Sequence, residues 1–349
     1  MDFIGWIASI GALLLTMSLV SGWIRGLPIT TYVLYMLVGI AAGPAVLDLI
    51  GIDFVRDSPW LERLTEITLI VSLFVGGLKL RVPFSDRAWR SAIRLASVAM
   101  VLTVGAVGAL VHALLHFDWP MALMLGAMLA PTDPVLSSIV AVGGADDRDD
   151  LRVALSAEAG FNDGTVLPLF LLGLAVFNTG FSWPTAMHWG LVQVLWGVPA
   201  GLAIGYAMGR FAGAAIVRLR TSTSAGAPGD LLMLALLLLA YAAAHGAHAL
   251  GFLAVFAAGL GLRGAEVAIV NRQPQAETGH AAPPGERPPA EDLVDPRDDG
   301  AEQRQPTLAV GRMMFGALSF GDTLERLLGT LLVLLLGVLL VEYWSLRGL

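Results

Sequence analysis

This chain of 349 residues has 56% hydrophobic and only 14% charged residues, whereas about a quarter of the residues of a soluble domain are charged. The composition therefore excludes a soluble globular domain and indicates a polytopic membrane protein. The formal net charge is −7, and there is no cysteine in the sequence. Disulfides, thiolate nucleophiles and Cys-ligated metal sites are thereby excluded.

Apolar runs of about 17–25 residues, the length that crosses a bilayer as a helix, occupy most of the chain. The first follows Asp2, where a signal peptide carries Lys or Arg, and it is longer than a signal h-region. We therefore interpret it as a membrane span and predict an all-α fold. The ten predicted spans are 3–22, 28–50, 66–80, 92–116, 119–142, 152–177, 187–209, 230–247, 249–262 and 315–342.

The loop after the third span is basic, with five Lys and Arg residues between Lys79 and Arg94. Short cytoplasmic loops carry the excess of such residues. If every span crosses once, this loop lies inside and the N-terminus outside. We therefore predict a multi-pass protein of the inner or plasma membrane, in contact with membrane lipid and with no nucleic-acid partner.

Three regions follow from the change in composition along the chain. Residues 1–263 form a transmembrane bundle of about nine helices, and 312–349 contain the tenth helix. Between them, residues 264–311 are acidic and rich in Pro. Such a segment buries too little apolar surface to offset its ordering entropy, so we predict a disordered cytoplasmic loop.

The fifth predicted span contains the sequence APTDP. Proline lacks an N–H and clashes with the carbonyl one turn earlier, so Pro131 and Pro134 interrupt the helix. Irregular backbone at membrane depth is tolerated where it lines a cavity or is buried in protein. Freed carbonyls, the Thr132 hydroxyl and the Asp133 carboxylate are oxygen donors for a cation. The alternative is an ordinary proline kink with a capping aspartate.

The sixth span contains Glu158, Asn162 and Asp163 in an otherwise apolar run. Ionisable residues inside a membrane span are costly and indicate an ion pathway or a proton relay. A buried carboxylate can hold either a proton or a small cation, and that competition is the physical basis of antiport. For Glu158 the alternative is a structural ion pair. Because the arginines, including Arg263, are predicted at span ends or in loops, no buried cation is expected for it.

The stretches LGAMLAPTDPVL and ALSAEAGFNDGTVLPLF resemble the Thr-Asp-Pro and Asn-Asp signatures of monovalent cation/proton antiporters of the NhaP and sodium/proton-exchanger type. The resemblance implies an inverted-repeat helical bundle with a broken fifth helix crossing near the sixth, and a homodimer. It makes Asp163 the ion- and proton-binding carboxylate. A monovalent cation would bind at Asp163, Asp133 and Thr132, and Asn162 would orient the site. The Asn-Asp pair implies electroneutral exchange.

The resemblance also implies that Glu158 pairs with a buried arginine of a later span. This chain departs from the family pattern at Ala159, where many relatives have a serine hydroxyl, and at Val75 and Gly76, where many have an acidic residue. The family implies thirteen spans, so we expect this chain to lack the last three helices, including the one that carries the arginine.

We predict a secondary transporter that exchanges Na⁺ or Li⁺, with K⁺ as a further candidate, for H⁺ by alternating access at Asp163. No cofactor is expected, and we do not predict an enzyme. One alternative is a truncated fragment without transport activity. Another is an intramembrane aspartyl protease using Asp133 and Asp163, with Asp322 as a third candidate.

Overall fold

The computed structural model describes residues 11, 15, 31–44, 46–132, 142–220, 229–272, 287–294 and 306–346. Regular structure within these ranges is entirely helical, which confirms the predicted all-α fold. The chain divides into two compact units, one of residues 1–68 and 323–349 and one of residues 69–322. Two long helices, α3 (Phe54–Lys79) and α13 (Pro306–Leu346), contribute residues to both units.

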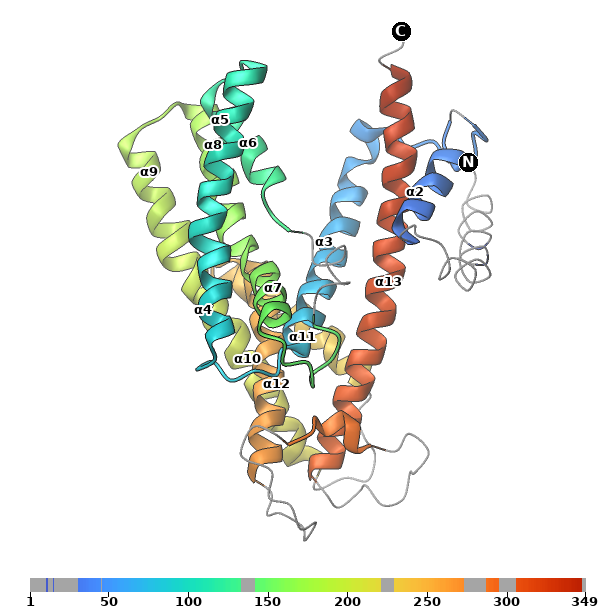
Figure 1. Cartoon of the computed structure of the whole chain (residues 1–349), viewed down its shortest axis with the longest axis vertical. Coiled ribbons are helices and arrows are strands. Elements are labelled where there is room, and N and C mark those ends of the chain that lie inside the picture. The colour runs from blue at the N-terminus through green and yellow to red at the C-terminus, as the bar shows by residue number, and fades with distance from the viewer. Residues whose placement is uncertain are drawn as a thin grey trace. The chain divides into compact units, whose positions relative to one another are not determined.

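Each predicted span from the second to the tenth overlaps a helix (Figure 1). The first predicted span, 3–22, lies almost entirely outside the described residues. Six described helical stretches are long and apolar enough to cross a membrane, and two apolar helices are shorter. The remaining helices are α2 (Thr31–Ala42), α4 (Arg87–Arg94), η1 (Leu95–Ala99), α5 (Met100–Leu115), α6 (Trp119–Leu129), α7 (Asp150–Phe161), α8 (Asp163–Thr179), α9 (Trp183–Trp189), η3 (Gly190–Gly197), α10 (Val198–Arg220), α11 (Gly229–Gly246), α12 (Gly251–Arg272) and η4 (Ala290–Leu293).

Helix α12 is the centre of the larger unit, because 78% of its most apolar window is buried. Its neighbours approach closely where one of the two helices has a glycine. A Cβ atom at Gly205 of α10 would collide with the Ala254 carbonyl of α12, and one at Gly259 of α12 would collide with the Phe74 carbonyl of α3. Small residues at such positions let helix backbones come together in membrane proteins. Glycines thereby set the packing of α3, α10 and α12.

The smaller unit is held by α2 and the second half of α13. A Cβ atom at Gly39 would collide with the Leu334 carbonyl, so these two helices also meet through a glycine. Ile52, Leu334 and Val338 belong to the buried cluster of this unit. The Ile52 amide donates a hydrogen bond to Glu342 Oε2 at 3.2 Å, which ties the segment before α3 to α13.

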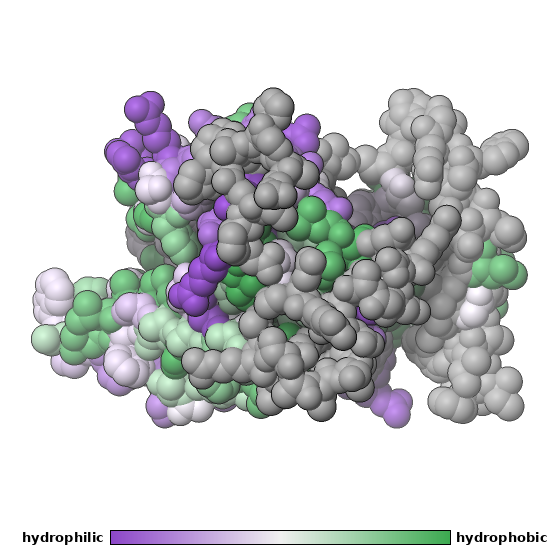
Figure 2. All heavy atoms as spheres, turned by 90° about the horizontal axis from the view of Figure 1, so that it is seen from below, coloured by the Kyte–Doolittle hydropathy of each residue, from purple (hydrophilic) through white to green (hydrophobic). Residues whose placement is uncertain are grey.

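The described parts of residues 264–311 differ from the predicted disordered loop. Helix α12 continues to Arg272, η4 forms at 290–293, and α13 begins at Pro306. In the view from below, hydrophilic side chains lie beside hydrophobic ones (Figure 2). The reason for the difference is local: Arg263 and Glu266 form an ion pair one turn apart, so the apolar helix can continue past both charges.

Candidate functional site

The break in the fifth span lies where the prolines predict it. Helix α6 ends at Leu129, and the Ala130 amide still donates to the Gly126 carbonyl at 3.0 Å. Pro131 and Thr132 follow in non-helical conformation. Residues 133–141, which include the predicted site residues Asp133 and Pro134, lie outside the described residues. The described part of the break therefore ends at Thr132.

The sixth span is a nearly continuous helix made of α7 and α8, with Asn162 at their junction. The Asp149 carboxylate caps its start by accepting from the Leu151 and Arg152 amides at 2.9 and 3.1 Å. The backbone N–H of Asn162 donates to the backbone carbonyl of Glu158 at 2.8 Å. This backbone bond places Glu158 and Asn162 one turn apart on one face of the helix.

Three predicted site residues meet between the break and this face. Thr132 Oγ1 donates to Glu158 Oε2 at 2.8 Å. Asn162 Nδ2 donates to the Thr132 carbonyl at 3.0 Å and lies 3.3 Å from its hydroxyl oxygen. Glu158 is 5% exposed and Asn162 is 1% exposed. The buried side-chain amide of Asn162 therefore fixes both oxygens of Thr132, and the Thr132 hydroxyl in turn holds the Glu158 carboxyl.

Asp163 directly follows this cluster, because it is the first residue of α8 and the neighbour of Asn162. The structure describes its backbone but not its side chain. Helix α8 continues through Pro168, but this residue has no N–H to donate to the carbonyl of Gly164. The polar cluster, the start of α8 and a freed carbonyl therefore lie within two helical turns. Within the described residues, no three His, Asp or Glu side chains form a group suited to a metal ion.

The prediction that the arginines lie at span ends or in loops was wrong for Arg263. Its side chain is 1% exposed, and it lies inside α12 rather than at a span end. It is nevertheless not the partner of Glu158, because it forms ion pairs with Glu266 and Glu291. Among the described residues no cation forms an ion pair with Glu158, whose side chain accepts a hydrogen bond from the Thr132 hydroxyl.

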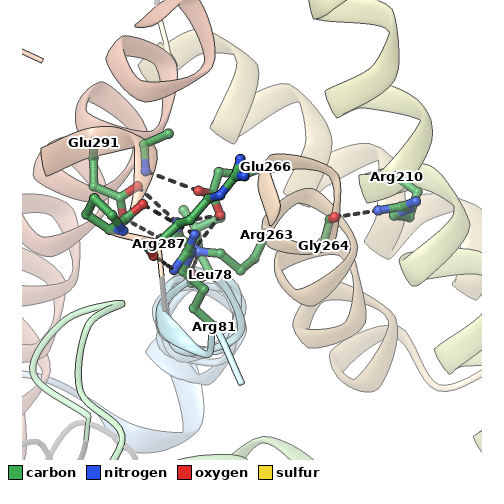
Figure 3. A network of polar contacts seen from close by, with 10 residues as sticks. Leu78, Arg81, Arg210, Arg263, Gly264, Glu266, Arg287 and Glu291 are labelled. Atoms are coloured by element: carbon green, nitrogen blue, oxygen red, sulfur yellow. Dashed lines mark hydrogen bonds and ion pairs between the residues drawn. The ribbon is translucent and has the colours of Figure 1, made fainter. Parts of the chain in front are cut away.

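Sequence reasoning missed the buried charge network around Arg263 (Figure 3). Arg81 Nε donates to Glu266 Oε2 at 3.1 Å, and Arg263 Nε donates to the Leu78 carbonyl at 2.7 Å. The available signal was the spacing of Arg263 and Glu266 within the apolar sequence GLRGAEVAIV, since opposite charges three residues apart share a helix face. The network joins the end of α3 to α12.

Thr132→Val provides a direct test of the cluster. Valine has the shape of threonine without the hydroxyl, so the variant removes the hydrogen bond to the Glu158 carboxyl. We expect a loss of about 1–3 kcal/mol of stability, the usual cost of leaving a buried hydrogen-bonding group without its partner. Thermal unfolding followed by size-exclusion chromatography measures this loss. Thr132→Ser keeps the hydroxyl and is the matched control, so equal destabilisation by both variants would contradict the assignment.

The fold and the cluster together define a polytopic α-helical membrane protein with a polar site at a helix break, an arrangement used by secondary transporters. The chain belongs to the sodium/hydrogen exchanger family, because the transmembrane model of that family matches residues 10–273.

Two relatives that are named as cation/proton antiporters are similar to about half of this chain. The K(+)/H(+) antiporter NhaP of Alkalimonas amylolytica is 29% identical over 180 residues, covering 50% of this chain and 30% of the relative. The Na(+)/H(+) antiporter ApNhaP of Aphanothece halophytica is 31% identical over 172 residues, covering 48% of this chain and 30% of the relative. Each alignment therefore spans less than a third of the relative's own length.

A solved structure has the same fold. The sodium proton antiporter MjNhaP1 from Methanocaldococcus jannaschii superposes with a TM-score of 0.64 at 20% sequence identity. The match covers 97% of this chain and 71% of that protein. This chain therefore shares the fold of that protein.

Proposed function

We propose that this protein exchanges a monovalent cation, Na⁺, Li⁺ or K⁺, for H⁺ across the membrane, with Asp163 as the group that binds either ion. The observation that carries the proposal is the buried Thr132–Glu158–Asn162 cluster at the helix break beside Asp163. Membership of the sodium/hydrogen exchanger family supports it, as do relatives named for Na(+)/H(+) and K(+)/H(+) antiport.

The roles of the residues follow from this chemistry. Asn162 holds the Thr132 carbonyl and hydroxyl in place, so that Thr132 and Asp133 can supply oxygen ligands at the break while Asp163 alternates between cation and proton. A buried carboxylate resists remaining charged without a partner, so release of one ion favours uptake of the other. With Asn162 rather than a second aspartate beside Asp163, we propose electroneutral exchange.

The topology and assembly belong to the same proposal. The basic loop between Lys79 and Arg94 supports an orientation in which that loop lies inside the cell and the N-terminus outside. We propose a homodimer in the inner or plasma membrane, formed as in the family that the sequence resembles. Chemical cross-linking in the membrane, followed by the mass of the product, tests this assembly.

Asp163→Asn is the decisive variant for exchange. We expect it to abolish cation-dependent proton movement, because the amide can neither release a proton nor carry the charge that holds a cation. The measurement is the collapse of a preformed pH gradient in everted vesicles on addition of Na⁺, Li⁺ or K⁺.

Asp118→Asn is the matched control for that assay. Asp118 precedes α6, is exposed, and makes no capping hydrogen bond through its side chain, so the same chemical change there should leave exchange intact. The proposal fails if the wild-type protein collapses the gradient with none of the three cations. It also fails if Asp163→Asn retains wild-type exchange.

A further inference from the structure

Three exposed arginines, Arg87, Arg90 and Arg94, begin the continuous helix that is made of α4, η1 and α5, and we call them the arginine cluster. None of the three forms an ion pair within the described part of the chain. Asp86 is the only acidic residue between positions 80 and 115, and its carboxylate caps the helix by accepting from a backbone N–H of the first turn. The three guanidinium groups are therefore available to an anion from outside the protein.

The arginine cluster lies at the depth expected for lipid headgroups. Residues 87–115 form one of the helical stretches that are long and apolar enough to cross a membrane. Their helix is about 43 Å long, and a bilayer with its headgroup regions is about 40–45 Å thick. The first two turns therefore lie at one membrane surface. In the proposed orientation this is the cytoplasmic surface, where anionic lipids create a negative potential.

A cavity of about 520 Å³ begins beside the arginine cluster. Ile93, three residues after Arg90 on the same helix face, lines the cavity, as does Val101 two turns further along. Its other walls are formed by α8, η3 and α10, through Gly164, Pro168, Leu169, Val194, Val198 and Leu202. Ile93 is 54% exposed and Val194 is 43% exposed, so the cavity opens to the surface between their helices.

The lining of this cavity suits a hydrocarbon chain. Trp189 Nε1 donates to the Pro168 carbonyl at 2.6 Å, and the Ser97 hydroxyl donates to the Ile93 carbonyl. Both polar side chains are therefore satisfied within the protein, and Thr165 is the only other polar residue of the lining. Protein interiors contain few voids larger than a water molecule. An apolar cavity of this size that opens within a membrane span is suited to an acyl chain.

We propose that the arginine cluster and the cavity together bind one anionic phospholipid, whose phosphate contacts Arg90 and Arg94 while one acyl chain occupies the cavity. The helix rises about 16 Å from Arg90 to Val101, and the hydrocarbon part of one leaflet is about 15 Å thick, so both ends of the lipid fit. Arginine binds phosphate through strong, often bidentate hydrogen bonds. A zwitterionic lipid carries its own ammonium group and competes less well. The bound chain lies against α8, beginning at Gly164, the residue after Asp163.

Photo-crosslinking in liposomes of phosphatidylcholine tests this site. Two tracer lipids carry the same acyl chain with a diazirine near its middle, one with a phosphatidylglycerol headgroup and the other with phosphatidylethanolamine. After irradiation, mass spectrometry of peptides locates the adducts. We expect adducts on the cavity lining, at Leu169 and Val198, to be at least about fivefold more frequent with phosphatidylglycerol, as attraction to even one interfacial arginine implies.

The double variant Arg90→Gln, Arg94→Gln should lose this preference, because the phosphate loses both guanidinium partners. Its phosphatidylglycerol adducts should fall at least about fivefold, to the level of phosphatidylethanolamine. The matched control is the double variant Arg148→Gln, Arg272→Gln, which removes the same charge from two exposed arginines on the same side of the membrane in the proposed orientation. Equal losses in the two double variants would overturn the proposal, because general surface charge would then explain the attraction.

Val101→Phe tests the position of the acyl chain. The larger side chain fills part of the cavity, so we expect it to remove most adducts from the cavity lining. Val98→Phe is the matched control, because Val98 lies on the same helix, is 62% exposed and is not part of the lining. The control should keep the adducts. Unchanged adducts in Val101→Phe would show that the chain lies elsewhere and would overturn the proposal.

Thermal unfolding in detergent provides a second measurement that needs no crosslinker. A ligand that binds the folded state raises its stability, so added phosphatidylglycerol should raise the unfolding temperature of the wild type more than phosphatidylethanolamine does. The Arg90→Gln, Arg94→Gln variant should unfold near the wild-type temperature without lipid and lose this response. Equal responses to both lipids, or an absence of adducts from the cavity lining, would overturn the proposal. Neither measurement requires ion exchange, so the result is independent of the proposed function.

Discussion

Arg263→Met is expected to lower the stability of the protein by about 3–5 kcal/mol, the usual cost of removing one partner of a buried ion pair. The methionine fills a similar volume, so the loss comes from charge rather than from a cavity. Glu291 would lose both of its bonds to the guanidinium, and the end of α3 would lose the donor to the Leu78 carbonyl. Thermal unfolding of the purified protein in detergent measures the effect.

The surface pair Arg63–Glu66 provides a matched control. Its atoms are 2.9 Å apart, but the arginine side chain is 73% exposed, and exposed ion pairs contribute about 0–1 kcal/mol. Arg63→Met should therefore unfold close to the wild-type temperature. The double variant Arg263→Met, Glu291→Gln should recover part of the loss, because the carboxylate left without its arginine is removed. Equal unfolding temperatures for Arg263→Met and Arg63→Met would show that the buried network does not stabilise the protein.

The helices and the break at Pro131 could be predicted from the sequence because their causes are local. Apolar runs define spans, and a proline ends a helix within one turn of itself. The paired motifs predicted that Thr132 and Asn162 belong to one site, but they did not predict a contact between the two side chains. That the Thr132 hydroxyl serves Glu158 could not be predicted, because it depends on how a non-helical segment packs against a helix 26 residues later.

The pairing of Arg263 with Glu291 could not be predicted for a similar reason. The predicted span ends at residue 262, one residue before Arg263, and the sequence after Arg272 has the composition of a solvated loop. Its carboxylate partner Glu291 returns from 28 residues further along, within a Pro-rich acidic stretch that local composition assigns to disorder. Composition averages over a segment, whereas a single buried ion pair depends on one carboxylate within it.

Gly205→Ala is expected to destabilise the protein by about 3 kcal/mol, at the upper end of the range for overpacking a core. The added methyl group would collide with the carbonyl oxygen of Ala254 and approach its carbonyl and Cα carbons within 2.6 and 2.8 Å. These are backbone atoms of α12, so no side-chain rotation relieves the overlap and the two helices must separate. Thermal unfolding followed by size-exclusion chromatography measures the loss.

The same substitution at Gly105 should have the opposite sign. Gly105 lies inside α5, is exposed, and has no atom within 4 Å of the position that a Cβ would take. Alanine there restricts the unfolded chain and favours the helix, which contributes about 0.5–1 kcal/mol. If the two variants, measured separately, shifted the unfolding temperature in the same direction, backbone contact between α10 and α12 would be contradicted. Opposite shifts would show that helix propensity determines the effect of the substitution at the exposed position. At Gly205 the effect would be determined by the distance between the two helices.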